Sequence, residues 1–209
     1  MFSIRLTAVS LVALLSAASV AAYIPLSVAD ITEDGFTYRV LTFTGDKTKV
    51  TFSPPPGWTF RGTKARLQLS PAGKPFAEAS IEAIPQPQPQ PLDVETIEAF
   101  KQQVIASAPA GSQAVVVESE GENTIMPESS PSYEVVLSYQ ALGKSFRRSV
   151  MLFNGATDSL IIRFTAPKED FAALTTPLRR SIMSWRTTEL KPGPNAAVAP
   201  AATAAAPAQ

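Results

Sequence analysis

The feature that most constrains the fold is a period-two alternation of apolar and polar residues in three successive segments between residues 133 and 164. The apolar positions are Tyr133, Val135, Leu137 and Tyr139, then Phe146, Val150 and Leu152, then Leu160, Ile162 and Phe164. Alternation of this kind predicts strands with one buried face. The connections contain Leu142-Gly143 and Asn154-Gly155, and glycine supplies the positive φ that tight hairpins need. Because short hairpins join antiparallel strands, these segments predict an antiparallel sheet.

Further strand-like segments precede this region. They span residues 36–43, 49–53, 66–70, 77–84 and 113–117. The last of them leads into an acidic stretch and completes a predicted meander of four strands. A proline- and glycine-containing turn separates the third segment from the fourth.

Two segments carry apolar residues at helical spacing. One opens at Asp93 and the other at Pro167, and Trp185 is expected to end the ordered region. Their apolar faces contain Val94, Ile97, Phe100 and Val104 in the first and Phe171, Leu174, Leu178 and Ile182 in the second. Pro177 lies inside the second helix and is expected to kink or divide it. The order strands, helix, four-strand meander, helix predicts an α+β fold, an antiparallel sheet flanked by helices.

The two ends of the chain differ in composition from the part between them. Residues 1–22 combine one positive charge, an apolar core and terminal small residues, which is the pattern of a signal peptide. Left uncleaved, the same segment would be a short membrane anchor. Residues 189–209 are rich in Ala and Pro and predict a disordered tail. We therefore expect a leader over residues 23–35, a folded domain over residues 36–188, and a periplasmic or extracellular protein.

The composition excludes several kinds of chemistry. The chain has no His and no Cys, so a Ser–His–Asp triad, a cysteine nucleophile and a thiolate or imidazole metal site are impossible within it. Lys and Arg number 18, as do Asp and Glu, so there is no basic excess for nucleic-acid binding. We expect no enzyme activity and no cofactor. The predicted role is an accessory or protein-interaction module of the cell envelope; the alternative is a periplasmic protein that binds a small ligand or a cation.

The expected partner is therefore an envelope protein, with contact to a membrane only if the N-terminal segment is uncleaved. Trp58, Arg147 and Arg163 are the candidate binding residues, because arginines from neighbouring strands could dock an anionic ligand or an acidic partner. Arg147 and Arg148 must point to opposite faces of their strand. The arginines could instead form cross-strand ion pairs with Glu134 or Asp158, and Trp58 could instead anchor its loop to the core.

A second candidate site is acidic. Glu118, Glu120 and Glu122 are spaced by two, so in a regular strand all three side chains project from one face. Three carboxylates placed in this way could bind a hard cation such as Ca²⁺. They could equally keep an exposed edge strand soluble and unpaired.

Short motifs resemble a known family. Residues 52–58 read F-S-P-P-P-G-W, and a strand, prolines and then Gly-Trp is similar to the opening of PsbP-like domains. The meander, Ala166-Pro167, Phe171 and the segment 182–185 resemble the closing half of that family. The resemblance spans residues 36–186 and implies an antiparallel sheet between helices and a non-catalytic accessory role.

Members of this family include the PsbP subunit that supports photosynthetic water oxidation, a nuclear Ran-binding relative of the Mog type, and bacterial envelope proteins. The chain departs from many bacterial members because it lacks a cysteine for lipid attachment. It also lacks the histidines that can support metal binding in the photosynthetic branch.

Overall fold

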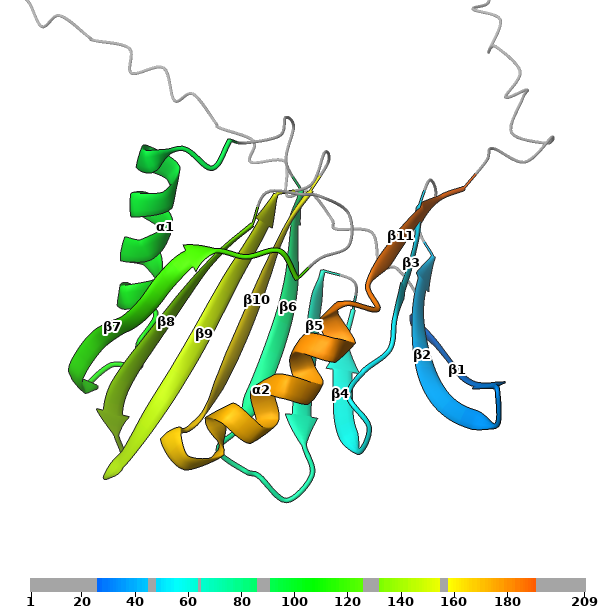
Figure 1. Ribbon diagram of the computed structural model, residues 1–209, viewed down its shortest axis with the longest axis horizontal. Helices are drawn as coiled ribbons and strands as arrows, with labels where there is room; N and C mark the ends of the chain where they lie inside the picture. Colours follow the sequence, from blue (N-terminus) through cyan, green and yellow to red (C-terminus); the bar gives the residue numbers. More distant parts are fainter. Residues whose placement is uncertain are drawn as a thin grey trace, which may run out of the picture.

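The computed structural model describes residues 26–44, 48–63, 65–85, 91–125, 132–154 and 158–190. The described residues form eleven strands and two helices (Figure 1). The elements are β1 (Leu26–Glu33), β2 (Phe36–Thr44), β3 (Thr48–Phe52), β4 (Trp58–Gly62), β5 (Arg66–Pro71), β6 (Glu78–Pro85), α1 (Val94–Ala106), β7 (Gln113–Glu122), β8 (Ser132–Ala141), β9 (Lys144–Asn154), β10 (Asp158–Pro167), α2 (Lys168–Ile182) and β11 (Arg186–Glu189).

The strands form two antiparallel sheets rather than the one that was predicted. A seven-stranded sheet has the order β4-β5-β6-β10-β9-β8-β7, and a four-stranded sheet has the order β1-β2-β3-β11. The predicted meander is confirmed, because β7, β8, β9 and β10 pair in sequence order. In the β8–β9 turn both Leu142 and Gly143 have positive φ, as a two-residue hairpin requires.

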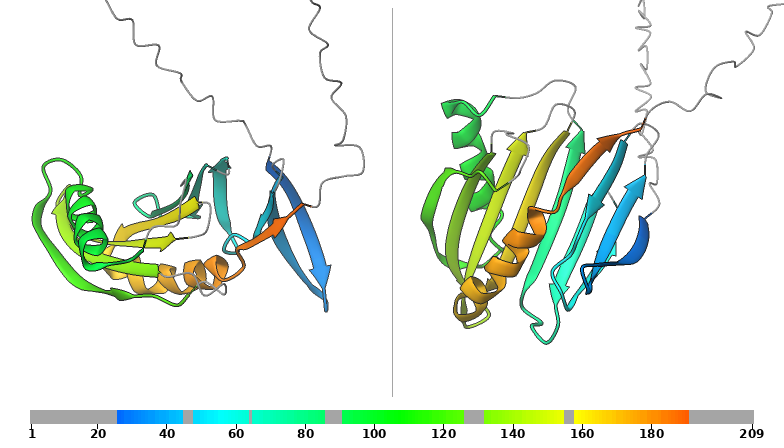
Figure 2. Two further views of the ribbon diagram at one scale, coloured as in Figure 1. Left: turned by 90° about the horizontal axis from the view of Figure 1, so that it is seen from above. Right: turned by 45° about the vertical axis from the view of Figure 1, so that its right-hand side comes forward.

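The two helices lie on opposite faces of the seven-stranded sheet (Figure 2). On one face, Phe100 and Val104 of α1 pack with apolar residues of β8 and β9 in the α1 core. Its buried members are Phe100, Val104, Val135, Leu137, Tyr139, Phe146, Val150 and Leu152. Along β9, Val150 and Leu152 belong to this core, whereas Met151 points to the other face.

The other face holds a larger core, the α2 core, to which both sheets contribute. Phe164 lies at its centre, with its ring centroid 5.2 Å from that of Phe171 on α2. The ring centroid of Phe52, in the small sheet, lies 5.6 Å from that of Trp185, which follows the end of α2. The buried members are Leu41, Phe43, Val50, Phe52, Trp58, Leu67, Leu69, Ala77, Ala79, Ile81, Met151, Phe153, Leu160, Ile162, Phe164, Ala166, Phe171, Leu178, Ile182 and Trp185.

Local sequence explains where the helices begin and continue. The Asp93 carboxylate accepts a hydrogen bond from the Thr96 amide at 2.8 Å, which caps α1. Of the two effects expected of Pro177, a kink or a division, the division is wrong, since α2 is one helix from residue 168 to residue 182. Phe171 and Ile182 are buried on either side of the proline, so packing holds both halves of the helix on the sheet.

Three strands were not predicted: β1, β4 and β11. β1 lies in the segment assigned to a leader and pairs with β2, and β11 follows Trp185, which was expected to end the ordered region. β1 and β11 have no buried face that a sequence pattern could reveal, since residues 27–33 and 186–189 are all exposed. The α+β class is confirmed. The sandwich of helix, sheet and helix describes only the large sheet, and strands dominate the fold.

Within the part of the chain that the structure describes, neither helix is long and apolar enough to span a membrane. The predicted signal segment and residues 191–209 of the predicted tail lie outside the described residues.

Candidate binding surfaces

Trp58 is a core residue at the start of β4. Its side chain belongs to the α2 core, its ring centroid lies 6.2 Å from that of Phe164, and it is 9% exposed. The Trp58 amide donates a hydrogen bond to the Pro55 carbonyl at 3.1 Å, which closes the proline turn before the strand. Its ring therefore offers little surface to a ligand.

Arg147 and Arg163 point to opposite faces of the seven-stranded sheet. Arg147 lies on the α2 side, with Nε 2.6 Å from a Glu118 carboxylate oxygen and its guanidinium 6.0 Å from the Phe171 ring centroid. Arg163 pairs in register with Val150 of the α1 core, so it lies on the α1 side. The two arginines therefore do not form one patch, because strand register places them on different faces.

Of the two expected partners of these arginines, Glu134 is bound by another residue, and the side chain of Asp158 lies outside the described part of the structure. Glu134 accepts hydrogen bonds from Arg179 of α2 at 2.6 Å instead of pairing with Arg147. Arg163 faces Glu82 of β6 at 4.0 Å. Arg148 shares the α1 side with Arg163, which agrees with the expectation that Arg147 and Arg148 point in opposite directions.

The three glutamates of β7 do not share a face. Between Val117 and Ser119 the pairing with β8 shifts by one residue, so Glu118 occupies a bulge. Glu118 contacts Arg147 and Lys168 on the α2 side. Glu120 binds Lys101 of α1 at 2.9 Å on the other side. The expectation that all three carboxylates project from one face is therefore wrong, because the bulge turns Glu118 to the other side. Among the described residues, no group of three or more acidic side chains is arranged to hold a metal ion.

The outer part of the β1–β2 hairpin is exposed along its whole length. Its turn is Asp34-Gly35, both with positive φ, and every residue from 27 to 39 is exposed. The register pairs Ile31 with Tyr38 and places Phe36 on the same face. Phe36 is 77% exposed, and Ile31 and Tyr38 are 41% and 38% exposed. The hairpin therefore presents an apolar face, which we define by Ile31, Phe36 and Tyr38.

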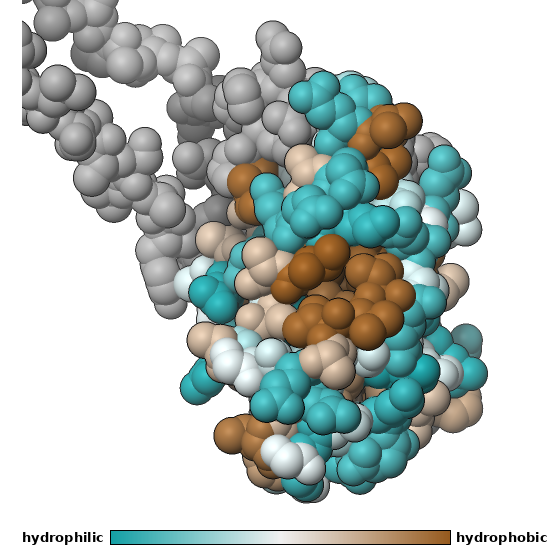
Figure 3. Space-filling model, turned by 90° about the vertical axis from the view of Figure 1, so that its left-hand side faces the viewer, coloured by the Kyte–Doolittle hydropathy of each residue, from teal (hydrophilic) through white to brown (hydrophobic). Residues whose placement is uncertain are grey.

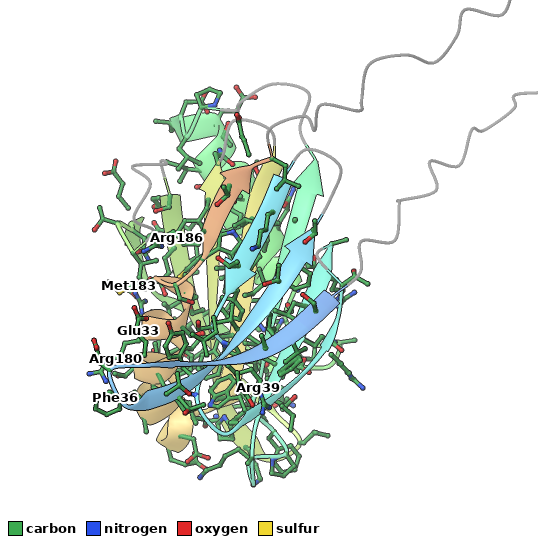
Figure 4. The ribbon with its side chains drawn as sticks, turned by 90° about the vertical axis from the view of Figure 1, so that its right-hand side faces the viewer. Glu33, Phe36, Arg39, Arg180, Met183 and Arg186 are labelled. Atoms are coloured by element: carbon green, nitrogen blue, oxygen red, sulfur yellow. The ribbon has the colours of Figure 1, made fainter. Side chains whose placement is uncertain are left out.

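Two polar pairs hold the hairpin side chains in place. The Tyr38 hydroxyl donates to a Glu33 carboxylate oxygen at 2.7 Å, which raises the pKa of Tyr38. Arg39 donates to Asp30 at 2.9 Å and lowers the pKa of Asp30. In Figure 4 Phe36 and Glu33 lie at the tip of the hairpin, and Figure 2 shows the hairpin projecting beyond the rest of the molecule.

A cleft of about 370 Å³ lies between α1 and strands β6, β10 and β9. Phe100, Leu152 and Ile161 form its apolar walls. At one end the Ser159 hydroxyl donates to the Asn154 side-chain oxygen at 2.6 Å. The cleft thus combines an apolar middle with a polar end, as many small-molecule sites do.

Arg148 lies further along the same side of the sheet, below the end of α1. It donates to Thr165 at 2.9 Å, to the Tyr139 hydroxyl at 3.3 Å, and to the backbone carbonyl and hydroxyl of Ser107. Burial lowers the pKa of Arg148 and raises that of Tyr139. All these hydrogen bonds of Arg148 end on uncharged oxygens.

The surface on the side of α1 and β7 is largely polar, with a central apolar patch that has a hollow and smaller apolar areas nearer its edges (Figure 3). On β7, an edge strand of the large sheet, the exposed large apolar residues are Val115 and Val116. Edge strands with apolar side chains are potential association sites.

Sequence reasoning missed the hairpin and the cleft. The Asp34-Gly35 pair between two short segments was the available signal for the hairpin, since Asp-Gly favours a two-residue turn. The cleft had no such signal, because its walls come from four separate elements.

Comparison with solved structures finds distant likenesses. A cyanobacterial PsbP (CyanoP) from Synechocystis sp. PCC 6803 has a TM-score of 0.49 and 10% identity over 83% of this chain and 99% of that chain. LpqN, involved in cell envelope biogenesis of Mycobacterium tuberculosis, has a TM-score of 0.44 and 14% identity over 80% of this chain and 92% of that chain. A protein from Bacteroides thetaiotaomicron has a TM-score of 0.43 and 12% identity over 69% of this chain, which spans 46% of that protein.

No protein-family model and no curated protein matches the sequence. All three structural likenesses have TM-scores below 0.5 and identities of 10–14%. At these identities and TM-scores, the likeness assigns no role to any residue of this chain.

Proposed function

We propose that the protein is a non-catalytic interaction module of the cell envelope, and that a partner protein docks on its β1–β2 hairpin. The observation that carries this proposal is the apolar face of Ile31, Phe36 and Tyr38 on a hairpin whose side chains are exposed from residue 27 to residue 39. Apolar groups gathered on a projecting element are typical of interaction sites. Aromatic side chains are also the commonest anchors of protein interfaces.

The backbone of the hairpin supports the same role. β1 is an edge strand of the four-stranded sheet, so one side of its backbone is unpaired within the described residues. A strand of a partner can add to such an edge, with backbone hydrogen bonds giving affinity and side-chain contacts giving specificity. The Tyr38–Glu33 and Arg39–Asp30 pairs hold side chains on both faces before docking, which reduces the entropy that binding loses.

The test is crosslinking in the native host, followed by affinity capture from the envelope fraction and mass spectrometry. We expect one reproducible partner with the unmodified chain, and its loss with Phe36→Ser. Leu142→Ser is the matched control, because Leu142 is also an exposed apolar residue in a hairpin turn but belongs to the large sheet. Both variants should remain folded, since both side chains are mostly in solvent.

Two results would overturn the hairpin as the docking site. One is equal capture by the Phe36→Ser variant and the unmodified chain. The other is loss of the partner on charge reversal at Arg147 or Arg163 with Phe36→Ser unaffected, which would place docking on the large sheet. Absence of any partner in repeated captures would count against an interaction module.

A further inference from the structure

Cationic side chains lie along β10 beyond the residues that line the cleft beside α1. Ile161 forms part of its wall, and Arg163 follows two residues later on the same strand face. A strand rises about 3.3 Å per residue, so Arg163 lies roughly 7 Å further along the sheet. Thr165, two residues beyond, accepts the hydrogen bond from Arg148. Side chains on this face therefore change from apolar to cationic in the direction of Arg163.

The charges at the two ends of the cleft are opposite. Glu95, in the first turn of α1, lines the end near Asn154 and Ser159. The arginines lie beyond the other end. An elongated ligand with a single anionic group is therefore favoured in one orientation, with that group away from Glu95 and next to Arg163.

The protein balances the positive charge of this region only in part. Glu82 is shared by two arginines, Arg66 at 3.2 Å and Arg163 at 4.0 Å. The Nε atom of Arg163 is buried and has no hydrogen-bond partner among the described residues. Arg148 donates to uncharged oxygens, and Glu78 adds its negative charge near it. An additional carboxylate at Arg163 would offset charge that the chain itself leaves uncompensated.

The dimensions of the cleft favour one slender ligand. Its volume of about 370 Å³ is at the lower end of the range of roughly 300–1,000 Å³ for small-molecule sites. From Ser159 to Arg163 the strand covers four residues, or about 13 Å. These values suit a single aliphatic chain rather than a lipid with two chains.

We propose that this cleft binds a single-chain amphiphile that ends in a carboxylate, with its aliphatic chain between Phe100, Leu152 and Ile161 and its carboxylate at Arg163. The apolar walls come from α1, β9 and β10, so the ligand lies between the helix and the sheet. The site is separate from the hairpin, and its occupation does not depend on a protein partner.

Decanoate is the probe, titrated into the full chain by isothermal titration calorimetry below its micelle concentration. We expect saturable binding to one site. Affinity should fall about threefold to fourfold for each methylene group removed on going to octanoate and hexanoate. Decanol, which has the same chain without the charge, should bind about tenfold more weakly than decanoate, because a charge-assisted hydrogen bond is lost.

Variants separate the two parts of the site. Arg163→Gln should weaken decanoate about tenfold and leave decanol unchanged. Arg61→Gln is the matched control, because Arg61 is on β4 at the far edge of the same sheet and donates to Gln68 at 2.7 Å. Ala99→Phe, which fills the cleft from α1, should abolish binding of both ligands. Phe36→Ser should bind decanoate like the unmodified chain.

Five outcomes would overturn the proposal. If decanoate does not bind, the cleft is not a site for single-chain carboxylates. Equal affinities for decanoate and decanol would show that Arg163 does not bind the carboxylate. Equal decanoate affinities of the Arg163→Gln and Arg61→Gln variants would show the same. Acetate that binds as tightly as decanoate, or binding unaffected by Ala99→Phe, would show that the cleft does not hold the chain.

Discussion

The β1–β2 and β8–β9 hairpins have the same kind of turn and opposite surroundings. Each turn has two residues with positive φ, Asp34-Gly35 in one and Leu142-Gly143 in the other. In β9 every residue from 149 to 154 is buried, because one core lies on each face of the large sheet. In the β1–β2 hairpin every residue from 27 to 39 is exposed.

This comparison separates what strand pairing contributes from what packing contributes. Backbone hydrogen bonds are made in both hairpins, yet a two-stranded ribbon is marginally stable in water without a packed face. The β8–β9 hairpin receives its stability from α1, α2 and its neighbouring strands. The β1–β2 hairpin has no such cover along its outer part, so docking of a partner would supply what the fold does not.

The largest expected difference concerns aromatic side chains in the two regions. Phe164 is fully buried between Trp58 and Phe171, so Phe164→Ala should lower the free energy of unfolding by about 3–5 kcal/mol. Phe36→Ala removes an exposed ring and should change it by no more than about 0.5 kcal/mol. Urea denaturation of the two variants measures both values. A loss of comparable size at Phe36 would mean that the hairpin is packed in solution.

A smaller difference in unfolding free energy is expected between variants of two arginine–carboxylate pairs, one in each region. Glu134 is half-buried and accepts from Arg179, from Ser149 at 2.6 Å and from Asn123 at 2.9 Å. Arg179→Ala leaves this carboxylate without its cation and should cost about 1–3 kcal/mol in unfolding free energy. Arg39→Ala breaks the exposed pair with Asp30 and should cost nothing measurable, because exposed ion pairs contribute little.

The same denaturation assay, repeated at high salt, checks the second expectation. Screening should leave the effect of Arg179→Ala largely in place, because its partner is sheltered from solvent. If Arg39→Ala proved the more destabilising of the two, the hairpin rather than the large sheet would carry the stronger ion pair, and the comparison would fail.

The elements that could be predicted from the sequence are those with a buried face. Tyr133 to Tyr139 alternate because every second side chain enters the α1 core, and the apolar stripe of α2 follows Phe171, Leu178 and Ile182 into the α2 core. β11 could not be found in this way. All four of its residues are exposed, and its pairing with β3 joins segments far apart in the chain.

The candidate sites depended on register, which alternation within one strand does not reveal. The sequence allows Arg147 and Arg163 to lie on the same face of the sheet. Only the pairing of β9 with β10 places them on opposite faces. The bulge at Glu118 is a further case, because one extra residue turns its side chain away from Glu120. The cleft could not be predicted for a related reason, since its walls come from β6, α1, β9 and β10, whose relative positions depend on the packing of the helix on the sheet.

The smallest expected effect is seen in the tyrosines of the two regions at alkaline pH. The pKa of Tyr139 is raised by burial, and that of Tyr38 is raised by its hydrogen bond to Glu33. A tyrosine whose pKa is raised in the folded state contributes stability at pH values below its unfolded pKa of about 10. This contribution is lost as the pH rises from the unfolded pKa through the folded pKa. Stability should therefore fall at alkaline pH, and less so in Tyr139→Phe than in the unmodified chain.

Glu33→Gln should return the Tyr38 midpoint to about 10 in an ultraviolet absorbance titration and leave Tyr139 unchanged. A Tyr38 midpoint that does not respond to Glu33→Gln would show that something other than the hairpin's own carboxylate covers this hydroxyl.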